Sequence, residues 1–206
     1  MSDERKGGLA LIFANVAGVL TMALHPLPHQ IGDPDSRILN VAVHALAMLA
    51  APIALVGGIA LARRTGSLSA VVFQAFALVA AVLATAMSGL VISSLLQQSA
   101  SRELLMVSRA LNQAFSRMFA VATSVALVLW SISGWRGHSL PRALAIYGVA
   151  CGVVSALFVF SGAPLDVHRF GALVLGQSIF FVWAGTTLLL TAPTGPEPPQ
   201  ERVARG

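Results

Sequence analysis

Apolar residues run along this chain in six long blocks, separated by short stretches of polar residues, glycine and proline. The blocks cover residues 8–25, 38–62, 68–96, 112–135, 140–161 and 165–191. Each is close to the roughly 20 residues that an α-helix needs to cross the hydrocarbon core of a bilayer. The pattern predicts an all-α, polytopic integral membrane protein whose six transmembrane helices lie within residues 1–192. Residues 193–206 are polar and rich in proline, which predicts a disordered cytoplasmic tail.

Composition supports this class. Charged residues make up 10% of the 206 residues, against about 25% in a soluble domain, so lipid has to cover most of the surface. The basic residues occur singly or in pairs between apolar blocks and form no stripe. A nucleic-acid partner is therefore excluded, and the bilayer is the expected partner.

The distribution of lysine and arginine predicts the orientation. With six spans, one side of the membrane receives the larger set, namely Arg5, Lys6, Arg63, Arg64, Arg136, Arg142, Arg202 and Arg205. The other side receives Arg37, Arg102, Arg109 and Arg169. By the positive-inside rule, both termini are cytoplasmic and the protein is a multi-pass protein of a bacterial inner membrane.

Small residues at helical spacing indicate where helices approach closely. Gly148 and Gly152 stand four apart in the fifth span, and Ala172 and Gly176 do so in the sixth. Such pairs favour internal helix packing, with a homo-oligomer as the alternative. The single cysteine, Cys151, excludes both a disulfide within the chain and a CxxC redox site.

Residues 24–46, LHPLPHQIGDPDSRILNVAVHAL, concentrate the scarce polar groups. His25 ends the first span, and His44 lies about 9 Å into the second, at 1.5 Å per residue. Met22 shares a helix face with His25, and Met48 shares one with His44. Because a short loop joins the two spans, the faces are expected to meet. His168, at the start of the sixth span, completes the candidate metal ligands.

A second polar stripe follows the fourth span. Arg109, Gln113 and Arg117 are spaced by four residues, with Asn112 beside them. Together with Asn40 and Asp166 they form the candidate ligand pocket. The two arginines would hold the anionic headgroup of a lipid or other small molecule. Alternatively, Arg117 only positions its helix by pairing with Asp33, Asp35, Glu103 or Asp166.

These groups allow several functions. Histidine and methionine favour copper or haem, and histidine with aspartate favours zinc. HxxxH, HExxH and CxxC spacings are absent, so a purely structural role, or partner binding without a ligand, stays open. A metal-dependent intramembrane hydrolase is a further alternative, although no catalytic residues can be named.

A transporter is the remaining alternative, and it requires polar groups near the midplane. The candidates share a lack of ionisable groups, which excludes proton coupling through a buried carboxylate; they are Asn15, Gln74, Thr85, Ser88, Thr123 and Gln177. The best single hypothesis is a small-ligand or metal-binding protein with its site at the extracytoplasmic face.

One segment carries a family resemblance. Residues 133–144 read SGWRGHSLPRAL, an S-G-x(5)-L-P-R-A-L pattern followed by an apolar helix with glycines. This segment, the six spans, and Asn112 followed by Arg117 in N-x(4)-R spacing resemble a family of bacterial six-helix membrane proteins described only as a domain of unknown function. The resemblance implies the six-helix fold and no reaction.

Overall fold

The computed structural model describes residues 1–26, 34–98 and 100–191. All secondary structure in these ranges is helical: α1 Asp3–Ala23, α2 Pro34–Thr65, α3 Leu68–Ala86, the π-helix η1 Met87–Ile92, α4 Ser93–Gln97, α5 Arg102–Arg136, α6 Arg142–Phe160 and α7 Val167–Thr191. Because α3, η1 and α4 run on as one segment, six segments of the described chain are long and apolar enough to cross a membrane. The all-α class and the six candidate spans are confirmed. The predicted disordered tail, His29 and Asp33 lie outside the described residues.

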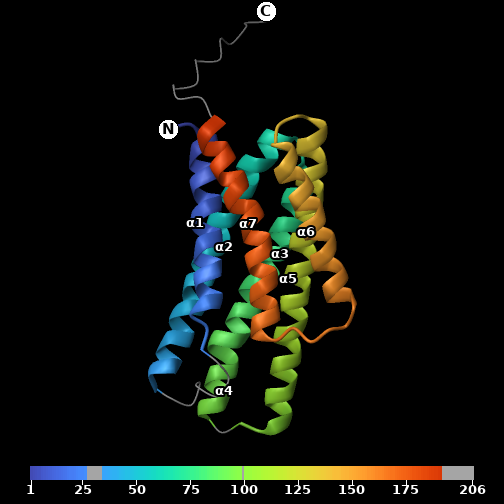
Figure 1. The fold of residues 1–206 in the computed structure, drawn as a ribbon. Helices are drawn as coiled ribbons and strands as arrows, with labels where there is room; N and C mark the ends of the chain where they lie inside the picture. The colour runs from blue at the N-terminus through green and yellow to red at the C-terminus, as the bar shows by residue number, and fades with distance from the viewer. Residues whose placement is uncertain (27–33, 99, 192–206) are drawn as a thin grey trace, which may run out of the picture.

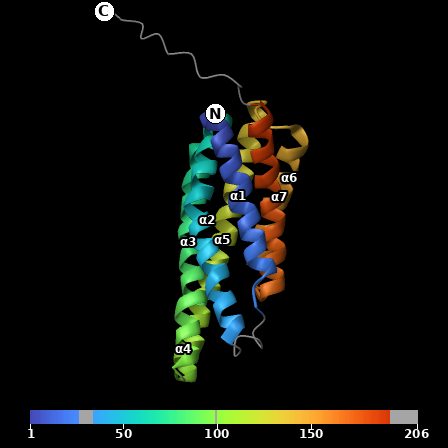
Figure 2. The same ribbon diagram turned by 90° about the vertical axis from the view of Figure 1, so that its left-hand side faces the viewer.

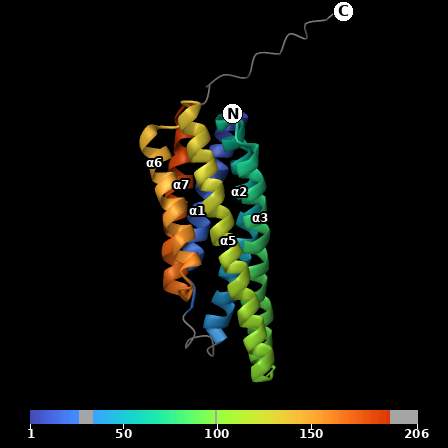
Figure 3. The same ribbon diagram turned by 90° about the vertical axis from the view of Figure 1, so that its right-hand side faces the viewer.

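The helices form an elongated bundle (Figures 1, 2 and 3). Helix α1 packs between α2 and α7, the α3 segment packs on α2 and α5, and α6 packs on α5 and α7. The expectation that the first two spans lie side by side is therefore confirmed. Asp3 and Thr191 lie at one end, here called the proximal end, and the α4–α5 turn marks the distal end (Figure 1).

Helix α5 is longer than its apolar block. It begins at Arg102, ahead of the predicted residue 112, because the Ser101 side chain caps it by accepting a hydrogen bond from the Leu104 N–H at 3.3 Å. An apolar block marks only the part of a helix that can lie in lipid, whereas a serine cap followed by good helix formers starts the helix itself. As a result α5 and the α3–α4 segment extend beyond α6 and α7 at the distal end (Figure 3).

Glycines bring α1 against its neighbours at the proximal end. A Cβ atom on Gly8 would lie 2.6 Å from the Gly185 carbonyl oxygen of α7, and one on Gly57 of α2 would lie 2.9 Å from the Leu11 nitrogen. The backbones therefore touch, as small residues permit. Gly18, nearer the distal end of α1, has nothing within 4 Å of the position that a Cβ atom would take. Helix α1 is thus tightly packed at its start and loosely packed at its end.

The largest cluster of buried apolar residues lies in the proximal half. Trp130, Phe180 and Leu188 are fully buried there, and the Trp130 and Phe181 rings meet edge to face with centroids 5.8 Å apart. Glycines of α6 also contribute, since a Cβ on Gly152 would lie 2.7 Å from the Ser124 carbonyl oxygen of α5. This glycine serves packing within the chain, as the GxxxG spacing favoured.

Two equivalent substitutions on α1 test this uneven packing. Gly8→Ala should lower the free energy of unfolding by about 1–3 kcal/mol, because the new methyl group overlaps the α7 backbone. Gly18→Ala should leave it unchanged or raise it by about 0.5–1 kcal/mol, since alanine favours the helix and meets no atom. Reversible unfolding in bicelles measures both, and equal effects would contradict the tight contact.

Candidate functional site

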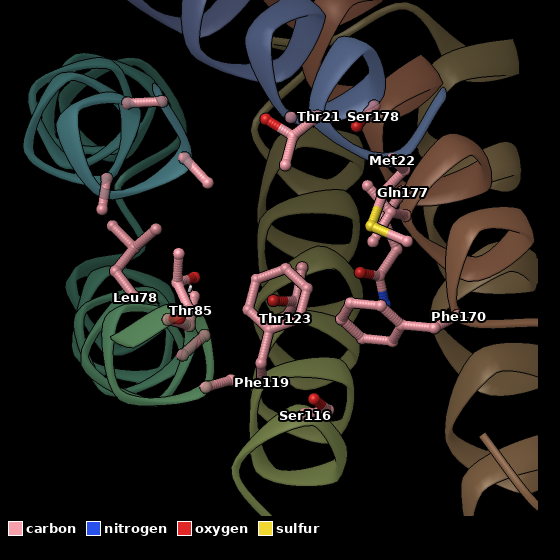
Figure 4. A pocket seen from close by; sticks show the side chains of 18 of the residues that line it. Thr21, Met22, Leu78, Thr85, Ser116, Phe119, Thr123, Phe170, Gln177 and Ser178 are labelled. Atoms are coloured by element: carbon pink, nitrogen blue, oxygen red, sulfur yellow. Dashed lines mark hydrogen bonds between the residues drawn. The ribbon is translucent and has the colours of Figure 1, made fainter. Parts of the chain in front are cut away.

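A cavity of about 400 Å³ lies in the distal half of the bundle. Its walls come from α1, α2, the α3–η1 segment, α5 and α7, and none of its described lining residues belongs to α6. Figure 4 shows side chains of these helices around the open centre. Small-molecule sites commonly measure about 300–1,000 Å³. The cavity is thus large enough for a small organic molecule.

Alanines make the space. On α2 the lining residues include Ala47, Ala50, Ala51 and Ala54, which recur with the period of one helix face, and on α3 the same holds for Ala77, Ala81 and Ala84. Where the side chains are methyl groups, they cannot fill the volume between the helices. This alanine stripe is visible in the sequence, and the polar residues alone do not reveal it.

The polar residues expected near the midplane all meet here. Asn15, Gln74, Thr85, Ser88, Thr123 and Gln177 line the cavity, although they come from separate helical segments. Phe119, Phe170 and Phe181 stand among them. The cavity therefore combines an apolar wall with polar groups at separate points, as ligand sites do.

His25 and His44 lie together at the distal part of the cavity. Their ring centroids are 5.0 Å apart, with the ring planes at 69°. His44 Nδ1 lies 2.6 Å from the Asn40 carbonyl oxygen, and His25 Nδ1 lies 2.9 Å from the Pro26 carbonyl oxygen. A carbonyl oxygen only accepts, so each Nδ1 carries the hydrogen. In the neutral rings both Nε2 atoms are left as acceptors.

The π-helix η1 packs against α2 at the position of His44. A Cβ on Gly89 would lie 2.6 Å from the His44 Cβ, so a glycine is needed where the two helices meet. One turn earlier on α2, the buried Asn40 side chain donates to Ser93 Oγ at 2.9 Å. π-helices often occur at functional sites, and here the irregular segment fixes the helix that carries His44.

Two glutamines lie deeper in the cavity, and each donates hydrogen bonds through its amide nitrogen. Gln177 donates its Nε2 hydrogens to the Ala120 carbonyl oxygen and to Ser124 Oγ, both at 3.2 Å. Gln74 donates to the Ala54 carbonyl oxygen at 3.1 Å. The amide oxygens of both glutamines are buried and have no hydrogen-bond partner among the described residues.

The predicted metal ligands are only partly brought together. Met22, His25 and His44 line the cavity, whereas Met48 does not, and His168 is exposed on α7 away from it. The described residues contain no group of three or more histidine, cysteine, aspartate or glutamate side chains that could hold a metal ion.

The predicted pocket also separates into two parts. Asn112, Gln113 and Asp166 line the cavity, while Asn40 lies behind His44. Neither arginine is among the lining residues: Arg109 is exposed, and Arg117 donates to the Ala163 carbonyl oxygen at 3.4 Å. Arg117 forms no ion pair with a carboxylate of the described chain, because Asp166 pairs instead with Arg169 at 3.5 Å.

Cysteine accessibility tests whether the cavity admits solutes. In a Cys151→Ser background, Thr123→Cys should react with the small neutral reagent methyl methanethiosulfonate, because residue 123 lines the cavity. Ser131→Cys, two turns along the same helix, should stay unmodified because Ser131 is fully buried in the core. Mass spectrometry of the intact protein measures the modified fraction, and comparable labelling at the two positions would contradict an accessible cavity.

Comparisons with known proteins give no relative. No family model matches the chain, and neither the curated proteins nor the solved structures contain a match. The resemblance to a six-helix family stays a prediction. Function therefore has to be inferred from the cavity itself.

Proposed function

We propose that this protein binds a small, neutral and mainly apolar molecule in its distal cavity. The observation that carries the proposal is the cavity itself, about 400 Å³ in volume and lined by alanines, phenylalanines and a few polar side chains. Cavities of this size in well-packed proteins are uncommon unless they are used. A membrane protein of six short-looped helices gains nothing in stability from such a void.

The charges around the cavity support a neutral ligand. Its described lining contains no lysine or arginine to attract an anion, so the expected anionic headgroup finds no partner there. The acidic lining residue, Asp166, is already paired with Arg169. An unpaired charge in an apolar cavity is costly, which disfavours charged organic molecules as ligands.

We also propose that the cavity faces the extracytoplasmic side of a bacterial inner membrane. The support is the excess of lysine and arginine in the segments at the proximal end, which by the positive-inside rule is cytoplasmic. The ligand then reaches the cavity from the distal end, where Gln113 and Asp166 are exposed, or from the outer leaflet.

A pair of phenylalanine substitutions on α2 tests the proposal. Ala47→Phe should abolish the binding of co-purified small molecules, because residue 47 lines the cavity and the new ring fills it. Ala45→Phe should keep them, since Ala45 is exposed on the same helix and does not line the cavity. Extraction of protein purified in nanodiscs, followed by mass spectrometry, measures the bound molecules per chain.

Two outcomes would contradict the proposal. Suppose wild-type protein carries nothing beyond bulk lipid, even after incubation with a total membrane extract. The cavity is then a packing void and the proposal fails. Equal loads on the wild type and Ala47→Phe would also contradict it.

A second candidate function, metal binding, is favoured by the histidine pair. A metal–nitrogen distance of about 2.0–2.1 Å places two imidazole centroids about 5 Å apart at a tetrahedral angle and about 6 Å apart across the ion. The observed 5.0 Å matches the first arrangement and not the second. Both Nδ1 hydrogens are held by carbonyl oxygens, as is usual for metal-binding histidines.

The distance between the two rings and the number of ligands decide which metal ions this site could hold. Opposed axial ligation of haem iron by His25 and His44 does not fit the short separation. A catalytic zinc takes three protein ligands besides water, which the described residues do not gather. A soft ion such as Cu(I), held by the two imidazole nitrogens, fits the residues present.

Histidine variants decide this candidate. His25→Ala and His44→Ala should each lower the affinity for Cu(I) by about tenfold or more, because each removes one of two nitrogen ligands. His168→Ala should change nothing, since that side chain is exposed away from the cavity. Competition against a chromogenic chelator measures the affinity, and zinc serves as the second ion. Equal affinities across the three variants would exclude the site.

A further inference from the structure

One buried side chain of the cavity, Gln177, presents only a hydrogen-bond acceptor, and this narrows the ligand class beyond the proposed function on which the inference rests. We infer that the ligand is a hydrogen-bond donor, an apolar body that carries a neutral hydroxyl or similar O–H or N–H group. The Gln177 amide oxygen is assigned as the acceptor that receives it. The inference comes from where the donor hydrogens of the lining side chains go.

Several lining side chains donate to the backbone. Beyond Gln74 and Gln177, Asn15 Nδ2 donates to the Leu11 carbonyl oxygen and Gln113 Nε2 to the Leu165 carbonyl oxygen, both at 2.9 Å. An amide nitrogen carries two hydrogens, so Asn15, Gln74 and Gln113 each keep one N–H that can still donate. Gln177 differs, because it uses both of its N–H hydrogens and keeps only the lone pairs of its amide oxygen.

Gln177 has the clearest unsatisfied acceptor. Its side chain is 2% exposed, and its Oε1 has no hydrogen-bond partner among the described residues. Figure 4 shows this side chain beside Met22 and Phe170, on the side of the cavity that faces Thr123. A buried acceptor that receives no hydrogen bond costs free energy. A methionine side chain is flexible enough to move aside for a ligand.

The histidine pair also presents hydrogen-bond acceptors, in the distal part of the cavity. Both rings use Nδ1–H on carbonyl oxygens and leave Nε2 as an acceptor. Other lining groups, such as the Thr123 and Ser178 hydroxyls, can rotate to donate or to accept. A ligand with acceptors only, such as an ether, leaves the Gln177 oxygen unpaired.

Two isomeric probes test the inference: 1-decanol and methyl nonyl ether, which share a formula and differ in the O–H donor. Titration calorimetry in nanodiscs, corrected for partition into empty nanodiscs, should show that the wild type prefers the alcohol by about fivefold, the effect of one hydrogen bond. Gln177→Met removes the acceptor at similar size, so its preference should fall to about one.

Tyr147→Phe is the matched control. It removes the hydrogen bond that the Tyr147 hydroxyl donates to the Gly176 carbonyl oxygen at 2.7 Å, next to Gln177 on α7. Tyr147 lies on α6 and is not among the lining residues, so this variant should keep the preference for the alcohol.

The remaining outcomes are distinguishable. If the wild type binds alcohol and ether with equal affinity, the inference is wrong and the proposed function is unaffected. The same holds if Gln177→Met still prefers the alcohol. If Gln177→Met does not fold, the wild-type preference alone decides. Binding of neither probe overturns the proposed function, and the inference falls with it.

Discussion

Backbone contact between helices at the proximal end determines the rest of this bundle. Gly8 and Gly185 allow α1 and α7 to touch, and Gly57 lets α2 receive Leu11. Helices fixed this closely at one end diverge toward the other unless side chains hold them together. In the distal half the cavity walls on α2 and α3 carry several alanines, whose methyl groups cannot span the gap. The cavity follows from tight packing at one end and small side chains at the other.

The sequence was sufficient for the fold class because six apolar blocks of membrane length have few alternatives. It also placed His25 near His44, since two helices joined by a short loop pack side by side. It could not bring together the polar residues of distant spans, because their meeting depends on the order of helices around the bundle. It left two roles open for Arg117 and did not point to the Ala163 carbonyl oxygen, to which this side chain donates, because a loop carbonyl leaves no pattern in the sequence.

Several polar side chains that line the cavity donate hydrogen bonds to backbone carbonyl oxygens. Asn15 and Thr21 bond to carbonyl oxygens of their own helix, and Gln177 bonds to one of α5. A buried donor that water cannot reach has to find its partner within the protein, and a nearby backbone carbonyl oxygen supplies it. These bonds keep each side chain in one orientation. A polar group that is held in place before the ligand arrives loses less entropy when the ligand binds.

The π-helix η1 has a consequence for how this cavity can change over time. A π-helix holds one residue more than an α-helix of equal length. Every residue beyond Met87–Ile92 is therefore rotated about the axis relative to a regular continuation. Ser93, the first residue after this segment, accepts the hydrogen bond from Asn40 of α2. Loss of a single residue would restore a regular helix and present a different residue to α2, a change of helix face that no point substitution makes.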